Sequence, residues 1–118
     1  VADDVLDWSI GRFADLTRGT GAVPMVLGLN AVIDDVPATI PNLEAIEAAQ
    51  LPLLDLFSVF PEADRPALRV APGDDHPNLA GHQLIADRLF SKLMPLLEAT
   101  IARHGQAVSA LHPVQRRF

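Results

Sequence analysis

A carboxylate and an imidazole lie close together in the segment Asp74-Asp75-His76-Pro77-Asn78. A carboxylate that accepts a hydrogen bond from one ring nitrogen of a histidine fixes the tautomer. The second nitrogen is then free to take a proton from a hydroxyl nucleophile. Pro77 restricts the backbone of His76, and Asn78 is a good N-cap for the amphipathic run that follows. The segment therefore predicts two members of a catalytic triad, on a short loop anchored to a helix.

The same residues resemble the C-terminal signature of the SGNH, or GDSL, hydrolases, a family of esterases and lipases. That signature reads Asp-x-x-His-Pro or Asp-x-His-Pro-Asn and is often followed by Gly-His, which here is Gly81-His82. The resemblance implies that His76 is the general base and Asp74 its orienting acid. In the longer form the acid would fall on Gly73, which has no carboxylate. The shorter form is therefore favoured, and Asp75 is the weaker candidate.

The nucleophile of that family is a serine in a Gly-Asp-Ser block, and no such block occurs in the 118 residues. None of the serines is expected on a strand-to-helix turn that would expose a nucleophile. These serines are Ser9, Ser58, Ser91 and Ser109. We therefore expect residues 1–105 to be the C-terminal portion of a three-layer α/β/α, flavodoxin-like hydrolase domain. Its partner would be the N-terminal part, which supplies the serine and the oxyanion hole.

The resemblance implies a carboxylic ester hydrolase of esterase, lipase or deacetylase type, acting on a small ester by acyl transfer to water. The chain alone is expected to be poorly soluble and inactive. The alternative is a non-catalytic α/β module that has lost the nucleophile and binds a carbohydrate or a protein.

Alternating helical and strand patterns must position the Asp-His segment. Apolar residues at helical spacing predict a first helix, capped by Asp3 or Asp4 and ended by a Gly-Thr-Gly turn. Two apolar runs, at residues 23–27 and 51–57, predict strands buried on both faces, with a helix over residues 42–50 between them. This order predicts α/β architecture with parallel strands joined by crossover helices.

A proline-punctuated loop after the second run is expected to deliver the Asp-His pair beyond the C-terminal end of a strand, where open α/β sheets place their ligands. The last helix is expected to start after Asn78, to be kinked or restarted at Pro95 and to end before Gly105. Residues 106–118 are expected to form a loose tail. The predicted buried face of this helix comprises His82, Ile85, Ala86, Leu89 and Leu93.

Each candidate residue also has a structural explanation. His76 could be a surface residue, Asp74 part of a Gly-Asp turn, and Asp75 a partner of the helix dipole. His82 is expected to pack against the sheet with a satisfied nitrogen. The Gly28-Leu29-Asn30 segment is similar to the Gly-x-Asn oxyanion block of the family. Its spacing to the histidine is short, however, so a strand that turns at Asn30 explains it better.

Composition disfavours several classes of function. Nine Lys and Arg against fifteen Asp and Glu give a net charge of −6, which argues against nucleic acid as a partner. The absence of cysteine excludes disulfides and thiolate metal sites. No apolar run reaches the length of a membrane span and no signal peptide is visible, so the localisation is open.

Neither a metal ion nor a cofactor is expected. A metal site built from Asp74, Asp75, His76 and His82 is disfavoured, because Pro77 and the helix start separate the two imidazoles. The Gly-Thr-Gly turn precedes its strand, whereas a dinucleotide-binding loop follows one.

Overall fold

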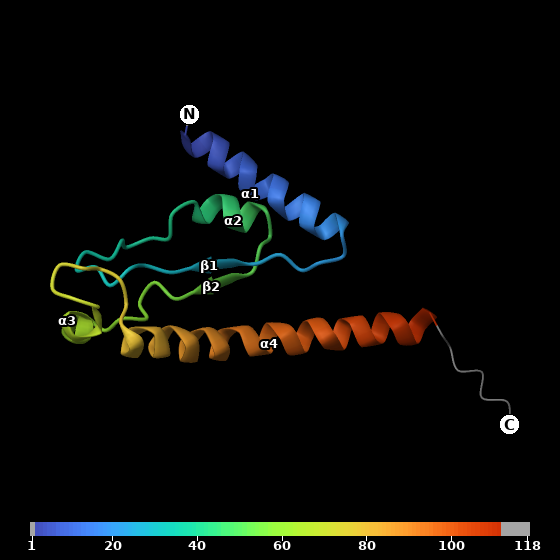
Figure 1. Cartoon of the computed structure of the whole chain (residues 1–118). Coiled ribbons are helices and arrows are strands. Elements are labelled where there is room, and N and C mark those ends of the chain that lie inside the picture. The colour runs from blue at the N-terminus through green and yellow to red at the C-terminus, as the bar shows by residue number, and fades with distance from the viewer. Residues whose placement is uncertain (1, 112–118) are drawn as a thin grey trace, which may run out of the picture.

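Helical and strand segments alternate along the first half of the chain, as its apolar runs predict. The computed structural model describes residues 2–111, with side chains from residue 3 to residue 107 (Figure 1). It combines helices with a two-stranded parallel sheet. The elements are α1 (Ala2–Gly19), β1 (Val26–Gly28), α2 (Leu43–Ala48), β2 (Leu53–Asp55), the 3-10 helix η1 (Glu62–Asp64), α3 (Arg65–Leu68) and α4 (Leu79–Leu111).

The two strands pair in parallel, and α2 forms the crossover between them, which confirms the predicted βαβ order. Val26 pairs with Leu53, and Gly28 pairs with Asp55. Both strands are shorter than the apolar runs that predicted them. At the end of β2 the Asp55 carboxylate accepts the backbone N–H of Phe57 at 2.9 Å, and this local turn draws the chain away from the sheet.

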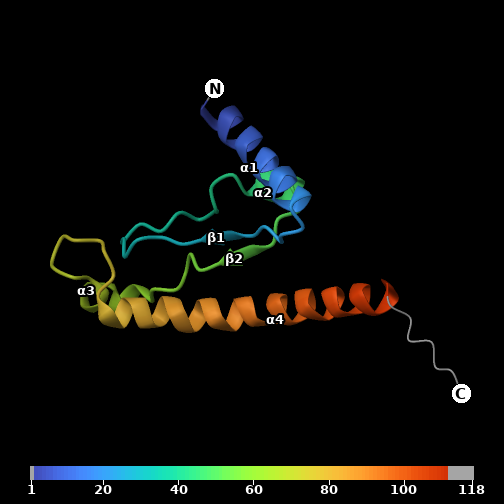
Figure 2. The ribbon, with the colours of Figure 1, turned by 45° about the vertical axis from the view of Figure 1, so that its right-hand side comes forward.

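Helices lie on both sides of the sheet (Figure 1 and Figure 2). On one side Ile46 of α2 and Ala14 of α1 form a cluster with residues of the strands. On the other side α4 packs against β2 and the segment that follows it. This second cluster comprises Val32, Leu54, Leu56, Val59, Phe60 and Leu68, covered by Leu84, Ile85, Leu89, Leu93 and Leu96 of α4.

Burial of β1 on both faces was expected, and this expectation is wrong. Leu27 pairs with the buried Leu54 yet remains 44% exposed. Paired residues of a parallel sheet point to the same face, so both side chains face the α4 side. Helix α4 packs mainly against β2, and Leu27 of β1 is left partly exposed on that face.

Helix α1 begins at Ala2, so Asp3 and Asp4 lie in its first turn and are not its N-caps, contrary to expectation. Two acidic side chains in the first turn favour the helix through its dipole. A third departure is α3, which was not predicted from its four residues. Its Pro66 is tolerated because the first N–H groups of a helix need no partner within it.

Helix α4 begins at Leu79, as predicted, but runs for 33 residues without ending at Pro95 or Gly105. The predicted end before Gly105 is wrong, and residues 106–111 are helical. Pro95 removes one backbone hydrogen bond of the helix, and a glycine lowers helix stability by about 1 kcal/mol relative to alanine. The strong helix formers on either side of both residues outweigh these costs. The remainder of the expected tail, residues 112–118, lies outside the described residues. Across residues 2–111, no helix has the length and hydropathy that crossing a membrane requires.

We expect Gly81→Ala to destabilise the protein although alanine favours helices. A Cβ atom at position 81 would lie 2.8 Å from the Cβ of Pro77 and 3.1 Å from the carbonyl oxygen of Leu68. The free energy of unfolding should fall by about 1–3 kcal/mol. Gly11→Ala is the matched control, because a Cβ there meets nothing within 4 Å. It should raise stability by about 0.5–1 kcal/mol. Urea unfolding followed by circular dichroism measures both, and equal effects would contradict the packing.

Candidate functional site

The Asp-His pair lies on a loop beyond the C-terminal ends of the two strands. We call residues 69–78 the Asp-His loop; it is the yellow loop between α3 and α4 in Figure 1. Its base is closed by an antiparallel bridge between Arg69 and Pro77 and by a 3.0 Å bond from the Val70 N–H to the His76 carbonyl. Its tip turns at Gly73, whose φ of +80° lies in the left-handed region that glycine adopts without strain.

One carboxylate oxygen of Asp74 makes two contacts with His76. Asp74 Oδ1 accepts the backbone N–H of His76 at 2.9 Å and lies 2.6 Å from the ring atom Nδ1. The backbone N–H, followed by the imidazole, lowers the pKa of Asp74 below its usual value of 3.8. The carboxylate is therefore ionised at neutral pH and can only accept, so Nδ1 carries the proton.

The ring of His76 projects into solvent, and its side chain is 86% exposed. With the proton fixed on Nδ1, the lone pair of a neutral imidazole is on Nε2. That nitrogen can take a proton from a hydroxyl group brought to it. The geometry therefore provides an oriented general base.

The structure brings Asp74, and not Asp75, to the imidazole. The Asp75 carboxylate lies 3.5 Å from Arg69 Nε, and the Asp75 carbonyl accepts the N–H of Val32 at 2.8 Å. Asp75 therefore joins the Asp-His loop to the segment that follows β1.

Sequence reasoning missed Arg69, which organises this connection. Its side chain is only 14% exposed. Its Nε donates to the carbonyl of Val32 at 2.8 Å, and its Nη2 donates to Asp34 Oδ1 at 3.0 Å. Together with Asp75, these residues form the Arg69 cluster. A signal was present in the sequence, namely a single arginine between Leu68 and Val70 in a chain with three Asp-Asp pairs.

Asn78 anchors the other end of the loop. Its Oδ1 accepts the N–H of Gly81 at 3.1 Å, which confirms it as the N-cap of α4. Its Nδ2 donates to the carbonyls of Ala67 at 2.8 Å and Arg69 at 3.1 Å, and its own N–H donates to Leu68 at 2.7 Å. One side chain thus ties the start of α4 to the end of α3.

Gly28, the last residue of β1, and Asn30 lie at the same edge of the sheet as the Asp-His loop. Asn30 Nδ2 donates to the carbonyl of Phe57 at 3.4 Å, and Gly28 packs against the Phe57 ring. The amide thereby joins the segment after β1 to the turn after β2. This contact supports the structural explanation of the Gly-Leu-Asn segment.

His82 does not pack against the sheet as expected; its side chain is exposed. In the first two turns of α4, Gly81, Leu84 and Ile85 face inward, and His82 is rotated away from them. In the part of the chain that the structure describes, no three His, Asp or Glu side chains are grouped so that they could hold a metal ion.

No described serine hydrogen-bonds to His76. Ser9 Oγ donates to the carbonyl of Val5 at 2.7 Å, and Ser91 Oγ donates to the carbonyl of Arg88 at 2.8 Å. Both hydroxyl groups are therefore bonded within their own helices. Ser58 is exposed in the turn after β2. The side chain of Ser109 lies outside the described residues.

The chain matches no model of a known protein family, no curated protein and no solved structure.

Loss of the Arg69 cluster should loosen the site. Arg69→Met keeps an unbranched apolar stem but leaves the Val32 carbonyl and two carboxylates without a cationic donor. We expect the free energy of unfolding to fall by about 1.5–3 kcal/mol. The Val32 amide should also exchange faster with solvent, whereas that of Val26, which donates to Pro52, should be unchanged. The control Arg88→Met, at an exposed position of α4, should change stability by less than about 0.5 kcal/mol. Equal effects of the two variants would contradict the role of Arg69.

The Asp74 carboxyl should titrate below pH 3.8 in an NMR pH series. Because folding lowers this pKa, the stabilisation it brings is complete above the unfolded value and is lost as pH falls through the folded one. His76→Ala should raise the pKa of Asp74 only part of the way to 3.8. The larger cause of the lowered pKa is the hydrogen bond from the backbone N–H of residue 76, which the variant retains. His82→Ala should leave it unchanged. A native pKa at or above 3.8 would refute the double hydrogen bond.

Proposed function

We propose that this chain carries the general base, His76, and the orienting acid, Asp74, of a serine carboxylic ester hydrolase of the SGNH, or GDSL, type. The observation that carries the proposal is the 2.6 Å contact between Asp74 Oδ1 and His76 Nδ1, with the rest of the ring exposed. A surface histidine without a function needs no such orientation. Here the imidazole is held by a carboxylate on a loop that is itself anchored by Arg69 and Asn78.

In the proposed reaction a serine hydroxyl from a segment outside these residues attacks the carbonyl carbon of an ester. His76 Nε2 takes the hydroxyl proton as the new C–O bond forms, and then gives it to the departing alcohol oxygen. Water attacks the acyl-serine in the same way and releases a carboxylic acid and the free serine. Asp74 stays ionised and stabilises the imidazolium in both halves.

The partner in this proposal is the remainder of the hydrolase domain. A parallel sheet usually has both faces covered, yet here Leu27 is 44% exposed. On α1, Trp8 is 68% exposed and Leu16 is 55% exposed. Further strands beside β1 and a helix against α1 would cover these residues. With them, the helices on both sides of the sheet would form the three-layer α/β/α, flavodoxin-like architecture of the family.

The alternative is a non-catalytic α/β binding module. It is favoured by one observation, that none of the serines whose side chains are described contacts His76. The complete protein containing this chain separates the two functions. A fluorophosphonate probe should label a serine if the protein is a hydrolase, and should label nothing if it is a binding module.

In the complete protein His76→Ala should lower kcat for p-nitrophenyl butyrate by a factor of about 10² to 10⁴, the usual contribution of a general base. Asp74→Asn should also lower kcat, because the amide no longer stabilises the imidazolium. The matched control His82→Ala replaces an exposed histidine on α4 and should keep kcat within about twofold of the native value. Folded His76→Ala protein with unchanged turnover would overturn the assignment.

A further inference from the structure

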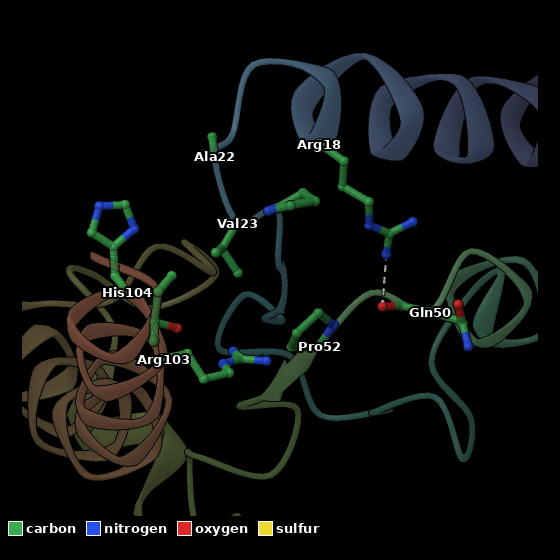
Figure 3. Close-up of a pocket in the computed structure, with 10 residues that line it drawn as sticks. Arg18, Ala22, Val23, Gln50, Pro52, Arg103 and His104 are labelled. Carbon is green, nitrogen blue, oxygen red and sulfur yellow. Dashed lines mark hydrogen bonds between the residues drawn. The ribbon is translucent and has the colours of Figure 1, made fainter. Parts of the chain in front are cut away.

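A cavity of about 410 Å³ lies at the other end of the sheet from the Asp-His loop (Figure 3). Because β1 and β2 are parallel, the residues before both strands meet at one edge. Residues 22–24, which precede β1, and Pro52, which precedes β2, form one side of the cavity. Thr100 and Arg103 of α4 are on the other side, and Arg18 reaches in from α1. The cavity is therefore separate from the proposed active site.

The cavity is cationic in a chain whose net charge is −6. Arg18, Arg103 and His104 line it, and no carboxylate is among its lining residues. Arg18 is held in place, because its Nη2 donates to the carbonyls of Ala49 at 2.7 Å and Gln50 at 2.9 Å. This contact is drawn for Gln50 in Figure 3. Such a fixed guanidinium raises the local potential for an anion without a new cost in side-chain ordering.

Arg103 is the group available to bind a ligand. It extends from α4 towards Pro52 in Figure 3. In the described part of the chain no hydrogen bond or ion pair engages its guanidinium. A planar guanidinium binds a carboxylate through two parallel N–H···O bonds. The site therefore offers paired donors next to a second, fixed positive charge.

Apart from Gln50 and Thr100, the remaining lining residues are apolar. Val23 is 44% exposed, and with Ala22, Pro24, Pro52 and Ala107 it surrounds the arginine side chains with aliphatic carbon. A fully hydrated inorganic anion would leave this surface unused. A ligand with an anionic head and a short alkyl chain would use both parts, and the volume is within the range of small-molecule sites.

We propose that this cavity binds a small aliphatic carboxylate, with its carboxylate on Arg103 beside Arg18 and its alkyl chain against Val23 and Pro52. The proposal does not depend on the proposed function, because none of these residues belongs to the Asp-His loop. Such a ligand would use both the guanidinium groups and the apolar lining of the cavity.

The test is an NMR titration of the complete protein that contains this chain with hexanoate, 1-hexanol and inorganic phosphate. We expect saturable amide shifts with hexanoate at Ala22 and Val23 and around Arg103. 1-Hexanol lacks the charge and phosphate lacks the chain, so each should bind at least about tenfold more weakly. Absence of saturation with hexanoate, or equal binding of phosphate or 1-hexanol, would overturn the proposal.

Arg103→Gln should weaken hexanoate binding by about tenfold or more, since it removes the charged, paired donors. Arg88→Gln is the matched control, because it makes the same change at an exposed position of α4 outside the cavity. It should leave the affinity unchanged. Arg103→Lys keeps the charge but not the paired donors and should give an intermediate affinity. Equal affinity of Arg103→Gln and Arg88→Gln, with native helix content by circular dichroism, would place the ligand elsewhere and refute the assignment.

Discussion

The arrangement of this chain depends on the Arg69 cluster, which fastens the Asp-His loop to the segment after β1. Arg69 is nearly buried, so its bond to the Val32 carbonyl is less exposed to competition from water than that of a surface ion pair, and a further bond joins it to the exposed Asp34. The Val32 N–H also donates to the Asp75 carbonyl. Main-chain and side-chain hydrogen bonds therefore join the Asp-His loop to the same segment after β1. The position of His76 is thereby linked to the end of a strand, although its own ring is in solvent.

The Asp-His loop combines a fixed base with an exposed tip. Asn78 and Arg69 hold the base, whereas at the tip the orientation of His76 comes from two donors converging on one oxygen of Asp74. Because the pair is exposed, geometry more than low dielectric sets its strength. A general base gains from water exclusion, and under the proposed function the segment that brings the serine would also cover the imidazole.

Features encoded by neighbouring residues could be predicted from the sequence. The order β1–α2–β2 follows from apolar runs and turns, and the Asn78 cap follows from its position before an amphipathic run. Features that depend on residues far apart in the sequence could not be predicted from it. Arg69 meets Asp34 across 35 positions, and the exposure of Leu27 depends on where α4 lies. The continuity of α4 was missed because propensity treats Pro95 as a break, whereas the neighbouring residues sustain the helix.

The charges of the chain are divided between the two ends of the sheet. Asp55 ends β2, and Asp34 and the Asp74-Asp75 pair follow the strands; Arg65 and Arg69 offset only part of their charge. Arg18 and Arg103 instead lie where the strands begin. Under the proposed function, ester hydrolysis turns a neutral substrate into a carboxylate at the acidic end. Repulsion there favours departure of the product, since like charges raise its free energy only after the bond is broken. An aliphatic carboxylate would then be retained at the cationic end, where positively charged side chains lie beside apolar residues.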